Sequence, residues 1–136
     1  MPKGLIPLHS IPAQKDYSVV RDGVRYSGVH LIIDLYGASR LNDLAFIEAT
    51  MRDCVKASGA TLLHIHLHPF EPNGVSGVAV LAESHISVHT WPELDYAAFD
   101  VFMCGNCRPD KAVAVLERIF APRRAEITEQ KRGLIE

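Results

Sequence analysis

The sequence of 136 residues has no long apolar segment, no large excess of charge and few cysteines. It contains no run of about 18 apolar residues that could cross a membrane, and prolines at positions 2, 7 and 12 interrupt the N-terminal apolar residues where a signal peptide would be continuous. The formal net charge of -2 argues against a nucleic-acid partner. Cys54, Cys104 and Cys107 make an odd count and no disulfide framework. The sequence therefore predicts a cytoplasmic protein with no membrane or nucleic-acid partner.

The composition is typical of one globular domain spanning residues 1–136. Hydrophobic residues make up 48% and charged residues 22% of the chain, which is ordinary for a folded protein. Residues 1–27 contain three of the eight prolines and predict a flexible or extended arm. There is no internal repeat. A chain of this length has much surface for its volume, so oligomerisation is expected.

Hydrophobic periodicity and turn residues predict an α+β fold. One helix is expected from Asn42 or Asp43, which can cap it, to a left-handed stop at Gly59, and another from Pro109 to Phe120. Strands are expected at 30–36, 61–70, 75–82, 85–90, 96–103 and 124–128. This order predicts a two-layer α/β sandwich with a mainly antiparallel sheet and both helices on one face. A second subunit is the simplest cover for the other face.

The most informative segment is 83–93, which reads Glu-Ser-His-Ile-Ser-Val-His-Thr-Trp-Pro-Glu. The Ser84 hydroxyl can attack the carbonyl of Glu83 and turn the peptide into an ester, which eliminates to dehydroalanine and hydrolyses to a pyruvoyl group. The two residues lie at an expected tight connection between strands, where a peptide can be held in a strained geometry. A pyruvoyl group would supply the electron sink that amino-acid decarboxylation requires.

Three stretches of this region resemble the small prokaryotic S-adenosylmethionine decarboxylases, which are pyruvoyl enzymes. They are Gly-Val-Ser-Gly-Val from Gly74, the segment 83–93, and Tyr-Ala-Ala-Phe-Asp-Val-Phe-Met-Cys-Gly ending at Gly105. The resemblance extends over about 28–132 and includes His-Leu-Ile-Ile-Asp from His30. It implies a proenzyme that cleaves itself between Glu83 and Ser84, and two fragments that stay folded together. It also implies a homodimer with active sites at or near the subunit interface.

The resemblance further implies the reaction and the roles of individual residues. The substrate amine would form a Schiff base with the pyruvoyl group made from Ser84, and loss of carbon dioxide would give the aminopropyl donor for spermidine synthesis. Cys104 would be the proton donor, while His89 and Ser76 would assist self-cleavage. Phe70, Trp91 and Glu93 would line the substrate site, with Phe70 stacked on adenine and Glu93 bonded to the ribose hydroxyls.

Each of these residues also has an ordinary structural interpretation. Ser84 alone would be a turn serine, and Ser76 a strand serine chosen for its small size. His89 alone would be a half-buried structural residue, although imidazole titrates near neutrality and suits proton transfer. Cys104 alone would be a small core residue.

Other functions remain open at the level of sequence. A pyruvoyl enzyme with this scaffold could instead decarboxylate ornithine or arginine, because only the pocket distinguishes the side chains. Cys104 and Cys107 form a Cys-x-x-Cys motif before a helix, which is typical of redox proteins. His64, His66 and His68 alternate along one strand, so they share a face that His30 could join. The resemblance itself requires no metal. An unprocessed regulatory subunit is a further alternative.

Overall fold

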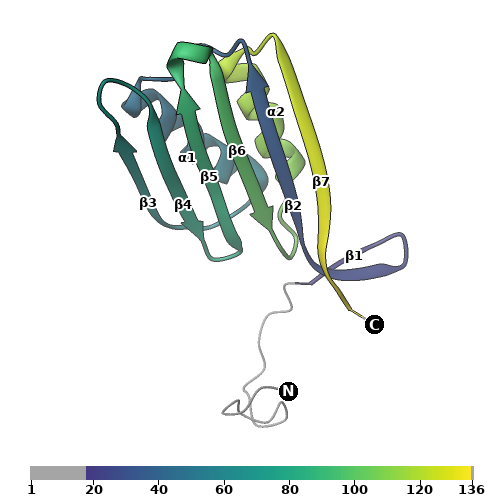
Figure 1. The fold of residues 1–136 in the computed structure, drawn as a ribbon. Helices are drawn as coiled ribbons and strands as arrows, with labels where there is room; N and C mark the ends of the chain where they lie inside the picture. Colours follow the sequence, from purple (N-terminus) through teal and green to yellow (C-terminus); the bar gives the residue numbers. More distant parts are fainter. Residues whose placement is uncertain (1–17, 136) are drawn as a thin grey trace, which may run out of the picture.

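The computed structural model describes residues 18–135 of the chain (Figure 1). Most of the arm predicted for residues 1–27 therefore lies outside the described residues. The elements follow in the order β1 (Val19–Arg21), β2 (Val24–Tyr36), α1 (Leu44–Ser58), β3 (Leu62–Pro69), β4 (Val75–Leu81), β5 (Ser84–Trp91), the 3₁₀ turn η2 (Pro92–Leu94), β6 (Tyr96–Met103), α2 (Pro109–Phe120) and β7 (Arg124–Ile135).

The strands form a single antiparallel sheet, and both helices lie on the same side of it (Figure 1). The spatial order is β1-β2-β6-β5-β4-β3, and β7 also pairs with β2. The β2–β7 register runs from Arg25 opposite Ile135 to Tyr36 opposite Arg124. The predicted two-layer α+β sandwich is confirmed.

The two helices begin and end where local sequence signals predict. The Asp43 side chain accepts a hydrogen bond from the N–H of Phe46 at the start of α1 (3.0 Å), which satisfies one of the free donors of the first turn. Gly59 ends α1 with φ 75°, a conformation that glycine adopts without strain. Pro109 opens α2, where its missing N–H is not needed.

The hydrophobic core lies between the helices and the sheet. Ile47 and Met51 of α1 and Phe120 at the end of α2 are fully buried against sheet residues such as Ile33 and Phe99. The rings of Phe99 and Phe120 are 5.6 Å apart. This packing fixes β6, and its neighbour β5 carries Ser84, His89 and Trp91.

Two strands extend further than the sequence pattern predicts. Strand β2 begins at Val24 rather than at His30 and forms a hairpin with β1, so residues 19–27 form a hairpin of the sheet rather than an arm. Strand β7 continues to Ile135 rather than ending at Thr128. It lies at an edge and is mostly exposed, so it lacks the apolar alternation that marks half-buried strands.

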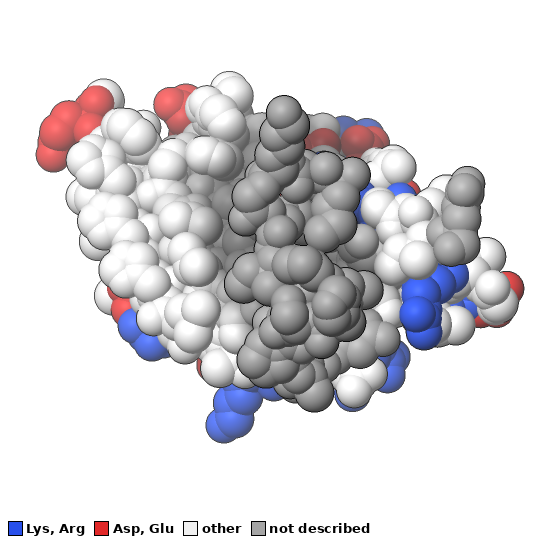
Figure 2. Space-filling model, turned by 90° about the horizontal axis from the view of Figure 1, so that it is seen from below, with Lys and Arg blue, Asp and Glu red and all other residues white. Residues whose placement is uncertain are grey.

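The sheet face away from the helices, here called the open face, carries exposed apolar side chains. Ile32, Phe70, Val80 and Trp91 are 42%, 49%, 41% and 41% exposed. Seen from below in Figure 2, the acidic and basic side chains of the described residues are scattered rather than gathered in one patch. No helix within residues 18–135 is long and apolar enough to span a bilayer.

Candidate functional site

The Glu83–Ser84 peptide bond lies at the tight turn between β4 and β5. Leu81 pairs with Ser84 across this hairpin, so Ala82 and Glu83 form a two-residue connection. Ser84 has φ 144°, a backbone conformation that residues with a Cβ rarely adopt and that costs on the order of 1–3 kcal/mol. The predicted tight connection is confirmed, and the strain is located on the serine itself.

The carbonyl oxygen of Glu83 accepts two hydrogen bonds from Cys104. The backbone N–H of Cys104 donates at 3.2 Å, and its thiol Sγ lies 3.1 Å away. Two donors directed at one carbonyl oxygen can stabilise negative charge that develops there when the carbonyl carbon is attacked. Burial raises the pKa of the Cys104 thiol, and the nearby Glu83 carboxylate raises it further. The thiol therefore stays protonated and able to donate.

Ser76 and His89 form a second group on the open face. They are opposite each other in the β4–β5 register, and the Ser76 hydroxyl lies 2.9 Å from Nδ1 of His89. The His89 ring is exposed and lies 6.5 Å from the ring of Trp91. The pair is therefore accessible from the side of the sheet that no helix covers.

The residues expected to line a substrate site lie beside this pair. The Phe70 ring contacts His68 (4.8 Å between centroids), and Trp91 stacks on Tyr96 at 5.2 Å. Glu93 lies in η2 and is exposed. These exposed aromatic faces could hold a flat heterocycle.

The predicted site residues thus separate into two groups within one chain. The first group, called the cleavage end, contains Glu83, Ser84 and Cys104. The second group, called the aromatic end, contains Phe70, Ser76, His89, Trp91 and Glu93. Along β5, His89 and Trp91 are five and seven positions from Ser84, which at the strand rise of about 3.3 Å per residue gives roughly 16 and 23 Å. One chain does not bring the two ends together.

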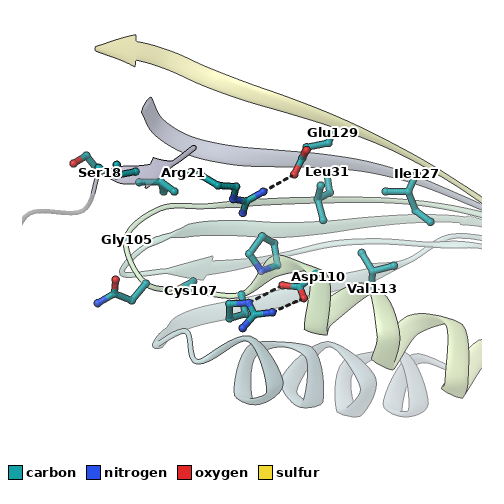
Figure 3. A pocket seen from close by; sticks show the side chains of 14 residues that line it. Ser18, Arg21, Leu31, Gly105, Cys107, Asp110, Val113, Ile127 and Glu129 are labelled. Atoms are coloured by element: carbon teal, nitrogen blue, oxygen red, sulfur yellow. Dashed lines mark hydrogen bonds and ion pairs between the residues drawn. The ribbon is translucent and has the colours of Figure 1, made fainter. Parts of the chain in front are cut away.

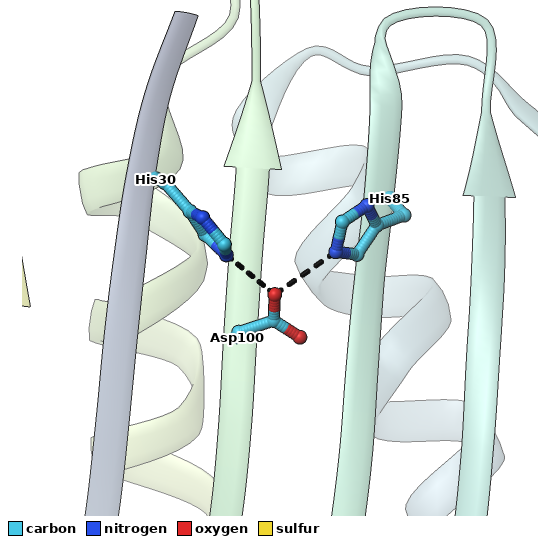
Figure 4. A group of neighbouring side chains, drawn as sticks. All are labelled: His30, His85 and Asp100. Carbon is cyan, nitrogen blue, oxygen red and sulfur yellow. Dashed lines mark hydrogen bonds and ion pairs between the residues drawn. The ribbon is translucent and has the colours of Figure 1, made fainter. Parts of the chain in front are cut away.

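A third polar group on the open face joins three strands (Figure 4). His30 of β2 and His85 of β5 direct their Nε2 atoms at Oδ2 of Asp100 of β6, at 2.5 and 2.9 Å. Ser87 donates to the other oxygen of Asp100, and an Arg132 nitrogen lies 3.4 Å from Nδ1 of His30. Partial burial opposes ionisation of Asp100, but the hydrogen bonds from Ser87 and the two histidines lower its pKa.

The same three side chains have the composition of a metal site, with ligand atoms within 4.8 Å of one another. The contact between Arg132 and Nδ1 of His30 fits a hydrogen-bond network better than it fits a metal site. Arg132 can only donate, so Nδ1 of His30 accepts and Nε2 carries the proton given to Asp100. A metal-bound imidazole normally donates its second N–H to an acceptor. His64, His66 and His68 share the open face as predicted, but no metal-type cluster within residues 18–135 includes them.

The Cys-x-x-Cys residues point to different partners. The Cys104 thiol lies against the Glu83 carbonyl, whereas the Cys107 thiol lies 3.9 Å from the carbonyl oxygen of Gly59. No disulfide joins the two cysteines. Their local contacts thus give no support to a redox pair.

A cavity lies elsewhere, beside β1, β7 and the start of α2 (Figure 3). It has a volume of about 750 Å³ and is crossed by two ion pairs, Arg21–Glu129 and Arg108–Asp110. Neither the cleavage end nor the aromatic end contributes to its lining. The candidate site is therefore the open face and the β4–β5 turn rather than this cavity.

Comparisons with known proteins identify one family. The family model of S-adenosylmethionine decarboxylase matches residues 29–133. A Thermomicrobium roseum protein named S-adenosylmethionine decarboxylase proenzyme is 48% identical over 110 residues, covering 79% of this chain and 95% of that protein. A Methanococcus maripaludis protein of the same name is 47% identical over 112 residues, covering 80% and 92%. The crystal structure of adenosylmethionine decarboxylase from Aquifex aeolicus superposes with a TM-score of 0.75 at 34% identity, covering 82% of this chain and 94% of that one.

Proposed function

The chain belongs to the S-adenosylmethionine decarboxylase family, and on that premise we infer that the protein is an adenosylmethionine decarboxylase. It releases carbon dioxide from S-adenosylmethionine and leaves the aminopropyl donor used in spermidine synthesis. Nothing in the fold or the comparisons favours ornithine, arginine, a redox function or a metal-binding function.

The observation that carries the proposed mechanism of maturation is the geometry of the Glu83–Ser84 bond. Ser84 is strained at φ 144°, and both Cys104 donors point at the carbonyl oxygen of Glu83. Attack by Ser84 Oγ forms a bond to the Glu83 carbonyl carbon and breaks the C–N bond, and the hydroxyl proton passes to the released amine. The strain is relieved as the peptide opens, and the donors hold the charge that builds on the carbonyl oxygen.

The next steps need a base, and we propose that His89 serves as that base with Ser76 orienting its ring. Removal of the Ser84 α-proton expels Glu83 as a carboxylate and leaves dehydroalanine. Addition of water and loss of ammonia then give a ketone at the start of β5. This pyruvoyl group supplies the electron sink for decarboxylation. Cys104, whose raised thiol pKa keeps it protonated, lies beside this chain end and is suited to deliver a proton to the product carbon.

We propose that the active enzyme is a homodimer in which the aromatic end of one chain faces the cleavage end of the other. A separation of roughly 16 to 23 Å within one chain is too long for one His89 to reach its own Ser84. It is also too long for one substrate molecule to contact both Trp91 and Ser84. A second copy packed on the open face supplies the missing half and covers the exposed Ile32 and Val80.

In this arrangement the aromatic end would bind the nucleoside part of the substrate. Phe70 and Trp91 present exposed rings to which adenine and the sulfonium group can bind. Glu93 offers carboxylate oxygens that accept hydrogen bonds from ribose hydroxyls. Because ornithine and arginine lack the nucleoside, they would gain nothing from these residues.

The test is intact mass spectrometry of the purified protein beside the variant Ser84→Ala. The wild-type protein should give two fragments that end at Glu83 and begin with a pyruvoyl group in place of Ser84, while the variant stays whole. The wild-type protein should also release carbon dioxide from carboxyl-labelled S-adenosylmethionine but not from labelled ornithine or arginine. A single uncut wild-type chain would refute the proposed maturation.

A further inference from the structure

Besides the contacts of Cys104 with its carbonyl oxygen, Glu83 is held through its side chain by hydrogen bonds that the cleavage chemistry above does not use. The residue is only 8% exposed, although carboxylates are seldom buried without a partner. The backbone N–H of Thr61 donates to Oε1 at 2.9 Å, and the Thr61 hydroxyl donates to Oε2 at 3.1 Å. Both oxygens of the carboxylate are therefore bound by one residue, Thr61, which directly precedes β3.

Thr61 also holds the residue before Glu83. Its carbonyl oxygen accepts the N–H of Ala82 at 3.0 Å, so three hydrogen bonds connect Thr61 to the two-residue turn. On the other side, Cys104 holds the Glu83 carbonyl oxygen. The turn is thus fixed from two loops that are far apart in sequence, the one before β3 and the one after β6. Ser84, the next residue, is the one with the strained φ.

We propose that Thr61 and the Glu83 side chain form a clamp that positions the scissile carbonyl against Cys104 before cleavage and retains the new chain end there afterwards. The clamp rests on the proposed self-cleavage. Thr61 and the Glu83 carboxylate act as positioning groups, because neither contacts the atoms that exchange bonds. Without the clamp, the turn could relax and turn the carbonyl away from its donors.

The clamp has a second consequence once the bond is cut. Glu83 becomes a chain end that nothing covalent ties to β5, and the Thr61 contacts keep it in place. Its side-chain carboxylate stays close to the Cys104 thiol, where it contributes to the raised pKa of that group. The same contacts therefore serve maturation and then keep Cys104 in the protonated form.

The first experiment follows the cleavage half-time of freshly made Thr61→Val, Thr61→Ser and Thr128→Val proteins by intact mass. Thr61→Val keeps the shape but removes the hydroxyl donor and should slow cleavage on the order of tenfold, the equivalent of one hydrogen bond to a charged group. Thr61→Ser should restore most of the rate. Thr128→Val makes the same change on exposed β7 and should cleave like wild type. A wild-type rate for Thr61→Val would overturn the clamp.

The second experiment does not require cleavage, so it separates failure of the clamp from failure of the proposed function. Ser84→Ala combined with Cys107→Ser leaves Cys104 and the fully buried Cys54 as thiols. The pH dependence of alkylation by iodoacetamide then reports the Cys104 pKa. Adding Glu83→Gln should shift the profile to lower pH, because it removes the nearby negative charge. Adding Glu126→Gln on β7 instead should leave the alkylation profile of Cys104 unchanged. An unshifted profile with Glu83→Gln would overturn the clamp even if the wild-type protein cleaves normally.

Discussion

The Sγ atom of Cys104 lies 3.1 Å from the carbonyl oxygen of Glu83, the residue whose peptide bond is proposed to break. The backbone N–H of Cys104 points at the same oxygen from 3.2 Å. One residue therefore provides both donors, and every substitution except proline retains the backbone donor. This makes the contribution of the thiol separable from that of the backbone.

Cys104→Ala should slow self-cleavage without abolishing it. The variant loses the thiol donor but keeps the N–H, so we expect a decrease of about fivefold, equivalent to about 1 kcal/mol for one neutral hydrogen bond. Cys104→Ser keeps a donor and should be closer to wild type. The half-time of cleavage, followed by gel electrophoresis or intact mass, measures both. Equal rates for Cys104→Ala and wild type would show that the thiol plays no part in this step.

The homodimer predicts complementation between two inactive chains. Ser84→Ala cannot be cut but retains His89, and His89→Ala retains Ser84 but lacks the base. Each variant alone should stay whole. When the two are co-expressed with distinguishable tags, a chain carrying His89→Ala should be cut by the His89 of its Ser84→Ala partner. If the mixed sample contains heterodimers by native mass spectrometry but no cut chains, His89 does not act across the interface.

Asp100→Asn should destabilise the protein at neutral pH more than in acid. The folded-state pKa of Asp100 is lowered, so the carboxylate contributes stability above its unfolded pKa of about 3.9, and this contribution is lost as the pH falls through the lower folded value. We expect a loss of roughly 1–2 kcal/mol near pH 7, because two histidine donors lose a charged acceptor. The difference should shrink at about pH 4 and below.

The measurement for Asp100 is urea unfolding in a Ser84→Ala background, which keeps every sample as one chain at one protein concentration. Asp53→Asn is a suitable control, since Asp53 is exposed on α1 and lies outside the Asp100 network. A constant difference between Asp100→Asn and the parent at all pH values would contradict the assigned ionisation.

Gly77→Ala should destabilise the β3–β4 pair. A methyl group at Gly77 would lie 2.7 Å from Cγ of Leu67 and 2.8 Å from the backbone oxygen of His66, and a backbone atom cannot simply rotate away. Overpacking of this kind costs typically about 1–3 kcal/mol. The melting temperature should fall clearly, while Leu63→Ala, at a 63% exposed position of the neighbouring strand β3, should change it little. Similar melting temperatures for the two variants would show that β3 can shift to accommodate the methyl group without a loss of stability.

Local sequence signals were sufficient to predict the ends of the helices and the position of the cleavage motif. Asp43 and Gly59 bound α1 through contacts with residues three or four positions away, so sequence alone can identify such ends. The Glu83–Ser84 pair lies in a two-residue turn for the same reason, since short connections between paired strands leave few conformations. The alternation of His64, His66 and His68 also predicted their common face, because the side-chain period of a strand is fixed.

The tertiary structure alone decided which residues meet. His30 joins Asp100 and His85 rather than His64, because β2 pairs with β6 in the middle of the sheet and β3 lies at the far edge. Thr61 has no sequence signal of its own, and its role arises where two distant loops converge on Glu83. His89 is close to Ser84 in sequence, yet the extended backbone of β5 carries it roughly 16 Å away. Composition and short motifs determine the chemistry a chain can perform, whereas strand order and register, set by long-range hydrogen bonds and burial, determine where its parts lie.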